Sequence, residues 1–267
     1  MSPGLRPLFQ AVPSIVISAL LGIVAGCGGG APLLHPAHVL PPGGTSVGAG
    51  VSGQLALRPL PAPSQASDKH AGSLQDLGIA PGVAPWVSAR LGFTGANELG
   101  LTYAGRSIRV DGRHAFSLGR ATLSTGLGLS AVIARRPGDG NDASGVFGGG
   151  ADVPLLIGVK SASDIYALWF GPRAGFEIAG GRLQLGQGAG SIFDVSARHF
   201  YGGLLAGIRV GFRHVHAAIE LDASYHRVDG SFKTSGAAGP APAPGAGTSS
   251  SVQQLSLTPA GALEISF

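Results

Sequence analysis

The sequence predicts an all-β fold: a closed antiparallel up-and-down transmembrane β-barrel of about ten strands, within a range of about 8–12. Two patterns predict it, because apolar and polar residues alternate along most of the chain, and short and long connections alternate between these segments. The composition agrees, with 46 glycines among 267 residues and only 12% charged residues. Glycine costs about 1 kcal/mol relative to alanine inside a helix, so long helices are not expected.

The alternation is clearest in residues 215–227, where every second residue is apolar and the residues between are polar or small. Residues 204–212 repeat the pattern, and only Arg213 and His214 remain for a turn, which predicts a long hairpin. Other segments with this alternation are residues 87–93, 99–103, 108–113, 123–130, 153–160 and 166–178, with a first strand near 46–57 and a last one at 254–267.

The connections provide the second pattern. Short ones fall at residues 95–97, 118–120, 163–164 and 213–214, and long ones at 58–83, 137–151, 180–191 and 233–251, with only the link at 105–106 breaking the series. Bacterial barrels have short periplasmic turns and long outer loops. If both chain ends are periplasmic, the short turns are periplasmic and the long loops face outward.

Charged residues fall on the face that would line the lumen. We predict that ion pairs form there among Arg109, Asp111, Arg113, Arg173, Glu177, Arg209, Arg213, Glu220 and Asp222. One interpretation is a polar channel or binding cavity. The other, favoured for so narrow a ring, is a core plugged by ion pairs, because an unpaired buried charge costs several kcal/mol.

Four residues fit the predicted strands poorly. Pro154, Pro172 and Pro259 lie within strands, where each removes a ladder hydrogen bond, so we expect bulges at these positions. Arg227 falls on the lipid-facing side. Because arginine at the middle of a bilayer costs about 2–4 kcal/mol, Arg227 is expected near the outer rim.

The N-terminal region has the features of a secretory signal. Arg6 precedes an apolar stretch from about residue 8 to 24, and Val24, Ala25 and Gly26 precede Cys27, the chain's only cysteine. This string resembles the lipobox of bacterial lipoproteins, which implies a signal peptide at residues 1–26, cleavage before Cys27 and diacylation of its thiol. A standard signal with cleavage nearby is the alternative. Residues 27–44 are rich in Gly and Pro without periodicity, which predicts a tether before a barrel domain at 45–267.

The chain as a whole resembles small bacterial outer-membrane β-barrels carried on a lipoprotein signal. Its last strand alternates up to a terminal Phe267, which resembles the carboxy-terminal signal read by the barrel assembly machinery. The resemblance implies residence in the outer membrane, a lipid anchor at Cys27, and outer-membrane lipid and the assembly machinery as partners.

No motif in the sequence indicates a particular substrate. It has no basic stripe typical of nucleic-acid binding, no H-E-x-x-H or G-x-S-x-G motif and no phosphate-binding loop, so we predict no metal, no cofactor and no catalytic residue, and any small-molecule ligand stays unknown. The leading function is a structural or binding barrel, or a narrow pore. One alternative is a barrel enzyme, a protease or lipid-modifying protein, with His199, Asp194 and Asp229 meeting at the outer rim. The other is a soluble β-sandwich surface lipoprotein.

Overall fold

The computed structural model describes residues 29–59, 71–135, 145–185, 191–236 and 247–267, which form a closed antiparallel barrel of ten strands. Each strand pairs with its neighbours in sequence, and the first pairs with the last. The strands are β1 (Thr45–Pro59), β2 (Gly82–Phe93), β3 (Asn97–Ala104), β4 (Ser107–Leu118), β5 (Ala121–Arg135), β6 (Gly145–Lys160), β7 (Tyr166–Leu185), β8 (Ser191–Phe212), β9 (Val215–Gly236) and β10 (Gly247–Ser266). The predicted fold class is confirmed, and the β-sandwich alternative is wrong.

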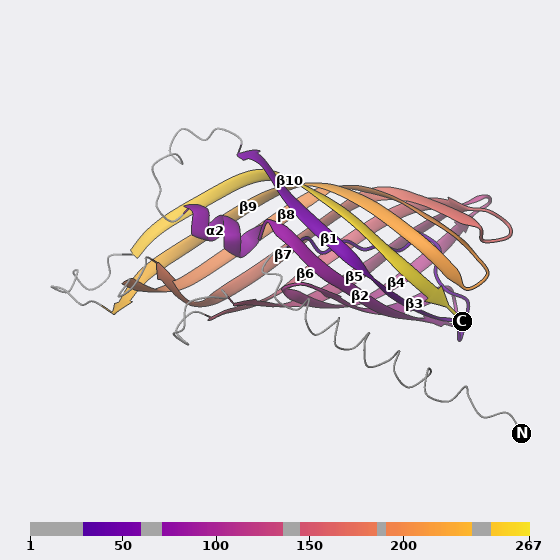
Figure 1. Ribbon diagram of the computed structural model, residues 1–267, viewed down its shortest axis with the longest axis horizontal. Coiled ribbons are helices and arrows are strands. Elements are labelled where there is room, and N and C mark those ends of the chain that lie inside the picture. The colour runs from indigo at the N-terminus through magenta and orange to yellow at the C-terminus, as the bar shows by residue number, and fades with distance from the viewer. Residues whose placement is uncertain (1–28, 60–70, 136–144, 186–190, 237–246) are drawn as a thin grey trace, which may run out of the picture.

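The two ends of the barrel differ as the connections predict. The links β2–β3, β4–β5, β6–β7 and β8–β9 are short and lie at the same end as the C-terminus, which we call the turn end (Figure 1). Ala96, Asp164 and Arg213 adopt positive φ angles there, as tight turns require. The opposite, loop end carries the long connections and the short β3–β4 link.

The wall of the barrel is uneven. Strands β2, β3 and β4 have 12, 8 and 12 residues, whereas β8 and β9 have 22 each and β10 has 20. A helix that the sequence did not predict, α2 (Ala71–Gly78), lies at the loop end against the inner face of these long strands (Figure 1). Its Leu74 and Leu77 pack with Val228, Phe232 and Val252. The helix therefore fills the loop end of the lumen, where the short strands β2, β3 and β4 do not extend far enough to enclose it.

None of the helices that the structure describes is both long and apolar enough to cross a bilayer.

The three prolines are accommodated without the expected bulges. Pairing is missing between β5 and β6 beside Pro154, between β6 and β7 beside Pro172, and between β10 and β1 beside Pro259. The register is the same on both sides of each gap, and the register shifts of the barrel lie elsewhere, near Pro59 and Phe193. A local gap in pairing leaves every later side chain on the same face of the sheet. A one-residue shift in register would instead move all of them to the opposite face.

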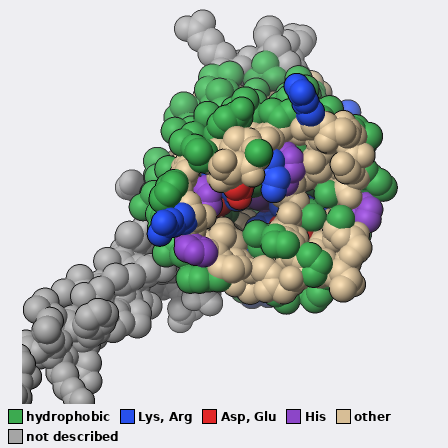
Figure 2. Space-filling model, turned by 90° about the vertical axis from the view of Figure 1, so that its right-hand side faces the viewer, with side chains coloured by type: hydrophobic (Ala, Val, Ile, Leu, Met, Phe, Trp, Pro, Cys, Tyr) green, Lys and Arg blue, Asp and Glu red, His purple; other side chains and the backbone are tan. Residues whose placement is uncertain are grey.

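Side chains are sorted in the sense opposite to that of a soluble protein. On β9, Ile219 and Leu221 point outward and are 64% and 46% exposed, whereas Glu220 between them is 1% exposed. The same alternation runs around the ring, so the outside is apolar, whereas the inside carries the charged and polar side chains together with two buried apolar clusters. Seen from the turn end, acidic, basic and histidine side chains surround a central hollow, further basic and histidine side chains lie at the rim, and hydrophobic groups cover much of the outside (Figure 2).

Residues 29–44, which we call the luminal segment, run through the interior of the barrel and end in the exposed Pro41, Pro42 and Gly43 at the turn end, just before β1. Near the loop end the Gly29 amide donates to the Ala80 carbonyl, just after α2, at 2.9 Å, and at the turn end the Gly43 amide donates to the Gly92 carbonyl, also at 2.9 Å. Between these points Leu33, Leu34 and Ala37 are no more than 1% exposed. The predicted signal peptide and Cys27 lie outside the described residues.

Candidate functional site

Buried ion pairs form a continuous chain across the lumen, and it includes the predicted Asp111, Arg109 and Arg173. It crosses five strands, β2, β3, β4, β6 and β7, and alternates in sign in the order Glu98, Arg90, Asp111, Arg109, Asp152, Arg173. Arg109 lies 2.6 Å from Asp111 and 2.7 Å from Asp152, and Arg173 lies 3.0 Å from Asp152. Asp111 and Asp152 each lie between two arginines, and Glu98 also pairs with Arg113 at 2.8 Å, so these buried charges are compensated.

Glu220 is the main acceptor for the luminal segment. One of its oxygens accepts the Leu33 amide at 2.7 Å, and the other accepts the Leu34 amide at 3.0 Å. The indole of Trp169 donates to the second oxygen at 3.0 Å. A buried carboxylate with three donors is well solvated by the protein itself.

Three more charged side chains reach the main chain of the segment. Arg113 donates to the carbonyls of Pro36 and His38, the latter at 3.2 Å, and Glu98 accepts the Leu40 amide at 2.8 Å. Arg173 donates to the Ala31 carbonyl at 2.5 Å. Arg113 and Arg173, which the sequence predicts only as ion-pair partners, therefore also hold a peptide backbone, together with Glu98.

The apolar side chains of the segment occupy their own pocket. Leu33, Leu34 and Ala37 form one buried cluster with Trp86, Ala104, Leu156, Trp169, Leu205, Ala218, Ala260 and Ala262, all from the inner faces of strands. Small residues on β9 and β10 make room there for the two leucines. Burying a leucine stabilises by about 1.5–3 kcal/mol.

A second polar cluster lies between the luminal segment and α2. The Nδ1 atom of His199 is 3.0 Å from Glu177, and its Nε2 atom is 2.9 Å from Nδ1 of His226, whose Nε2 atom is 2.7 Å from the Ser256 hydroxyl. Tyr201 lies against both imidazole rings. These hydrogen bonds join four strands from β7 to β10.

Arg106, in the short β3–β4 link, connects this cluster to the helix. It donates to the carbonyls of Leu77 and Gly78, at the end of α2, and lies 3.5 Å from Glu177. Cations are favoured at helix C-termini, where carbonyls are left without partners inside the helix. The cavity between α2 and the wall is only about 10 Å³, room for about one water.

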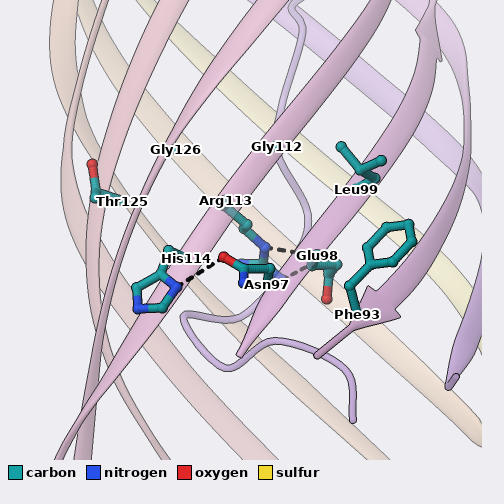
Figure 3. A pocket seen from close by; sticks show the side chains of 9 residues that line it. All are labelled: Phe93, Asn97, Glu98, Leu99, Gly112, Arg113, His114, Thr125 and Gly126. Atoms are coloured by element: carbon teal, nitrogen blue, oxygen red, sulfur yellow. Dashed lines mark hydrogen bonds and ion pairs between the residues drawn. The ribbon is translucent and has the colours of Figure 1, made fainter. Parts of the chain in front are cut away.

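A wider depression of about 400 Å³ opens at the turn end of β2 to β5 (Figure 3). Its residues come from both faces of the wall. In Figure 3 the inward pair Arg113 and Glu98 meets on one side, and His114 turns toward Asn97, at 2.8 Å, on the other. Phe93 and Leu99 complete an apolar edge.

Eight of the nine predicted lumen residues face the interior, and Arg213 does not. Arg209 pairs with Asp164 at 3.1 Å, and the Asp222 carboxylate accepts from Ser224. Arg213 is exposed in the β8–β9 turn, with its guanidinium over the ring of Phe212, because its positive φ ends the alternation one residue early. Asp152 and Trp169 were not among the candidates, although alternation places both on the inward face.

The rim cluster considered for catalysis is not assembled. Asp194 pairs with the exposed Arg182 at 3.4 Å, and Asp229 pairs with Arg227 at 3.0 Å, whereas His199 points into the lumen. Within the described ranges, no three His, Cys, Asp or Glu side chains are grouped in a way that could hold a metal ion.

Phe267 ends the chain beside the first strand. Its amide donates to the Thr45 carbonyl at 2.8 Å, and its ring is 73% exposed and stacks on His214. Its role as an assembly signal stays a prediction.

No family model and no curated protein matches this chain. Among solved structures, the unliganded ferric citrate transporter FecA is similar over 85% of this chain, at 10% identity and a TM-score of 0.36, and the chain spans 39% of its length. The CymD monoaromatic hydrocarbon channel is similar over 85% of this chain and 89% of its own length, at 9% identity and a TM-score of 0.31.

Proposed function

We propose that this chain is a bacterial outer-membrane β-barrel lipoprotein, with its turn end in the periplasm, and that it serves as a structural or binding barrel whose lumen is closed by its own chain. One observation carries the proposal: the exposed surface is the apolar one. Leu204, Ile219 and Leu263, on three strands, are each more than 60% exposed. Continuous apolar surfaces of this extent are not left in water by soluble monomers.

A lipid bilayer suits this wall, because the outer face is apolar and the backbone is paired within the closed sheet. A bilayer core offers no hydrogen bonds, so a spanning sheet has to close and pair its backbone internally, as this ring does. Arg227, an ionisable residue on the outward face, fits the same placement, because it lies just beyond Tyr225 on β9 and is paired with Asp229. Its charge would then sit at the rim rather than at mid-depth.

The filled lumen favours a closed barrel over the narrow pore. The luminal segment, the ion-pair chain and α2 follow one another along the interior, and the cavity beside α2 noted above has room for about one water. An open water path would require one of these to leave.

The test uses the full-length protein extracted in detergent. Intact barrels migrate faster on gels than boiled ones, so a heat-dependent shift is expected. After reconstitution into planar bilayers, we expect insertion without discrete conductance steps. A protein that stays monodisperse in detergent-free buffer and shows no shift on boiling would contradict the membrane assignment, and regular steps would favour the pore.

A further inference from the structure

We propose that the lumen is a peptide-binding site, with the luminal segment as its resident ligand, and that it takes an extended peptide of this kind added as a separate molecule. The ligand class is a short apolar peptide that begins with small residues and contains two adjacent leucines, with prolines before and after them. The inference rests on the proposed function, because it needs a barrel that is folded in a membrane or in detergent.

The luminal site recognises the peptide mainly through hydrogen bonds to its main-chain amides and carbonyls. Glu220 accepts two consecutive amides, Arg113 and Arg173 donate to carbonyls, and Glu98 accepts a further amide, so contacts are spread from Ala31 to Leu40. Every one is a hydrogen bond to a charged group, the stronger kind in proteins. Such contacts depend on the presence of a backbone and not on its covalent connection to β1.

The barrel holds these four side chains in place by itself. Arg113 is 2.8 Å from Glu98, Arg173 is 3.0 Å from Asp152, and Glu220 receives the Trp169 indole, all without any atom of the segment. A site whose groups are already oriented loses little freedom when a ligand binds. The four side chains therefore keep the orientation that binds a peptide even when no peptide is present.

The side-chain pockets set the specificity. Leu33 and Leu34 are 1% and 0% exposed, and a side chain on Gly30 would lie 2.3 Å from Thr258. Leu34 has a φ of +51°, a conformation that L-residues other than Asn and Asp seldom adopt, and its amide and side chain are both engaged. Strain of this sort persists where the surroundings over-determine a residue, which is typical of binding sites.

The link between the segment and β1 is open to cleavage. Pro41, Pro42 and Gly43 are exposed at the turn end, and a side chain built on Gly43 would meet nothing within 4 Å. A protease recognition sequence inserted between Pro42 and Gly43 would allow the whole chain to fold first. Cutting would then turn the segment into a separate, non-covalent ligand.

The experiment follows exchange of that ligand. The folded, cut barrel in detergent is incubated with a fluorescent synthetic peptide of residues 29–42 (GGAPLLHPAHVLPP), and binding is measured by anisotropy, with a scrambled peptide of the same composition alongside. We expect saturable uptake that unlabelled peptide reverses, and at least tenfold weaker binding of the scrambled peptide. Glu220→Gln should weaken binding about tenfold, whereas Glu264→Gln, on a luminal carboxylate that pairs with Arg209 at 3.8 Å, should not.

Two results would overturn the inference. One is a cut barrel that keeps its heat-dependent migration yet takes up the two peptides equally or not at all. The other is a barrel that loses this migration on cutting, which would make the segment a covalent part of the fold and not a ligand. A protein that lacks the migration shift before cutting would count against the proposed function instead.

Discussion

His199 and His226 form a direct side-chain contact inside the barrel, with their facing nitrogens 2.9 Å apart and their rings stacked at 17°. Because one nitrogen must donate and the other accept, the two rings share a single proton at this contact. The pair joins β8 to β9 and, through Glu177 and Ser256, the strands on either side.

Replacing one member of this pair should destabilise the barrel. His226→Ala removes the bonds to His199 and Ser256 and leaves buried polar atoms without partners, for a cost of about 2 kcal/mol. The urea midpoint at which the heat-dependent gel shift disappears would measure it. His114→Ala is the matched control, because that histidine bonds only an exposed Asn97, and it should change stability by less than about 0.5 kcal/mol. Equal effects of the two variants would contradict the prediction.

Lipid contact can be tested site by site. Spin labels at Ile208 and Leu221, which are 40% and 46% exposed on the outer face, should be accessible to oxygen and shielded from a water-soluble nickel reagent in vesicles. Leu205, 2% exposed on the inner face, provides the contrasting site. Labels at the outer positions that report tightly packed protein would exclude the membrane orientation.

Glu220→Gln should loosen the luminal segment. An amide side chain keeps one acceptor oxygen but places an NH₂ group against one of the two amides that the carboxylate accepted. Hydrogen exchange at Leu33 and Leu34 should accelerate about tenfold, which corresponds to about 1.4 kcal/mol. Glu264→Gln should leave these amides unchanged, and protection that is identical in both variants would argue against a holding role for Glu220.

Arg106→Gln should release α2 from the wall. The substitution removes the donor to the Leu77 and Gly78 carbonyls and the charge beside Glu177, at a cost of about 1–3 kcal/mol to local stability. Faster amide exchange within residues 71–78 would report it. Arg182→Gln breaks a pair whose side chains are 70% and 53% exposed and should have no such effect.

The anchor at Cys27 is tested by the mass of the mature N-terminus. We expect the diacylglyceryl mass in the wild type and in Gly28→Ala, and its complete loss in Cys27→Ser. An unmodified thiol in the wild-type protein would favour the standard signal peptide.

The strands were predictable because lipid and lumen impose a strict two-residue period, visible on β9 from Val215 to Arg227. The turns were equally visible, since little chain is left between the strands. The pairing of inward charges followed from the cost of leaving them alone in a narrow ring. Arg213 departs from the inward set because a local backbone angle decides the direction of its side chain, and Glu220 and Asp222 face the lumen but bond to amide, indole and hydroxyl donors rather than to arginines.

The contents of the lumen could not be predicted. The luminal segment is held by hydrogen bonds to its backbone, which any sequence could make, and by three buried apolar side chains at irregular spacing, so its Gly- and Pro-rich sequence shows no periodicity to detect. Helix α2 has eight residues and two main anchors, Leu74 and Leu77, too few to form an apolar stripe. Both depend on partners far away in the chain, such as Glu220, which lies 187 positions from Leu33.

The seam between β1 and β10 encloses the residues that immediately precede β1, so completing the circle and trapping those residues are a single topological event. The seam pairs Ser46 with Ser266, two residues far apart in the chain, and loop closure over such a span is slow. Until the barrel closes, the charged side chains that will line its lumen remain accessible to chaperones and other molecules that bind the unfolded chain. The luminal segment, whose amides and carbonyls bond Glu220, Arg113 and Arg173 in the closed barrel, is the part of the chain that then engages them.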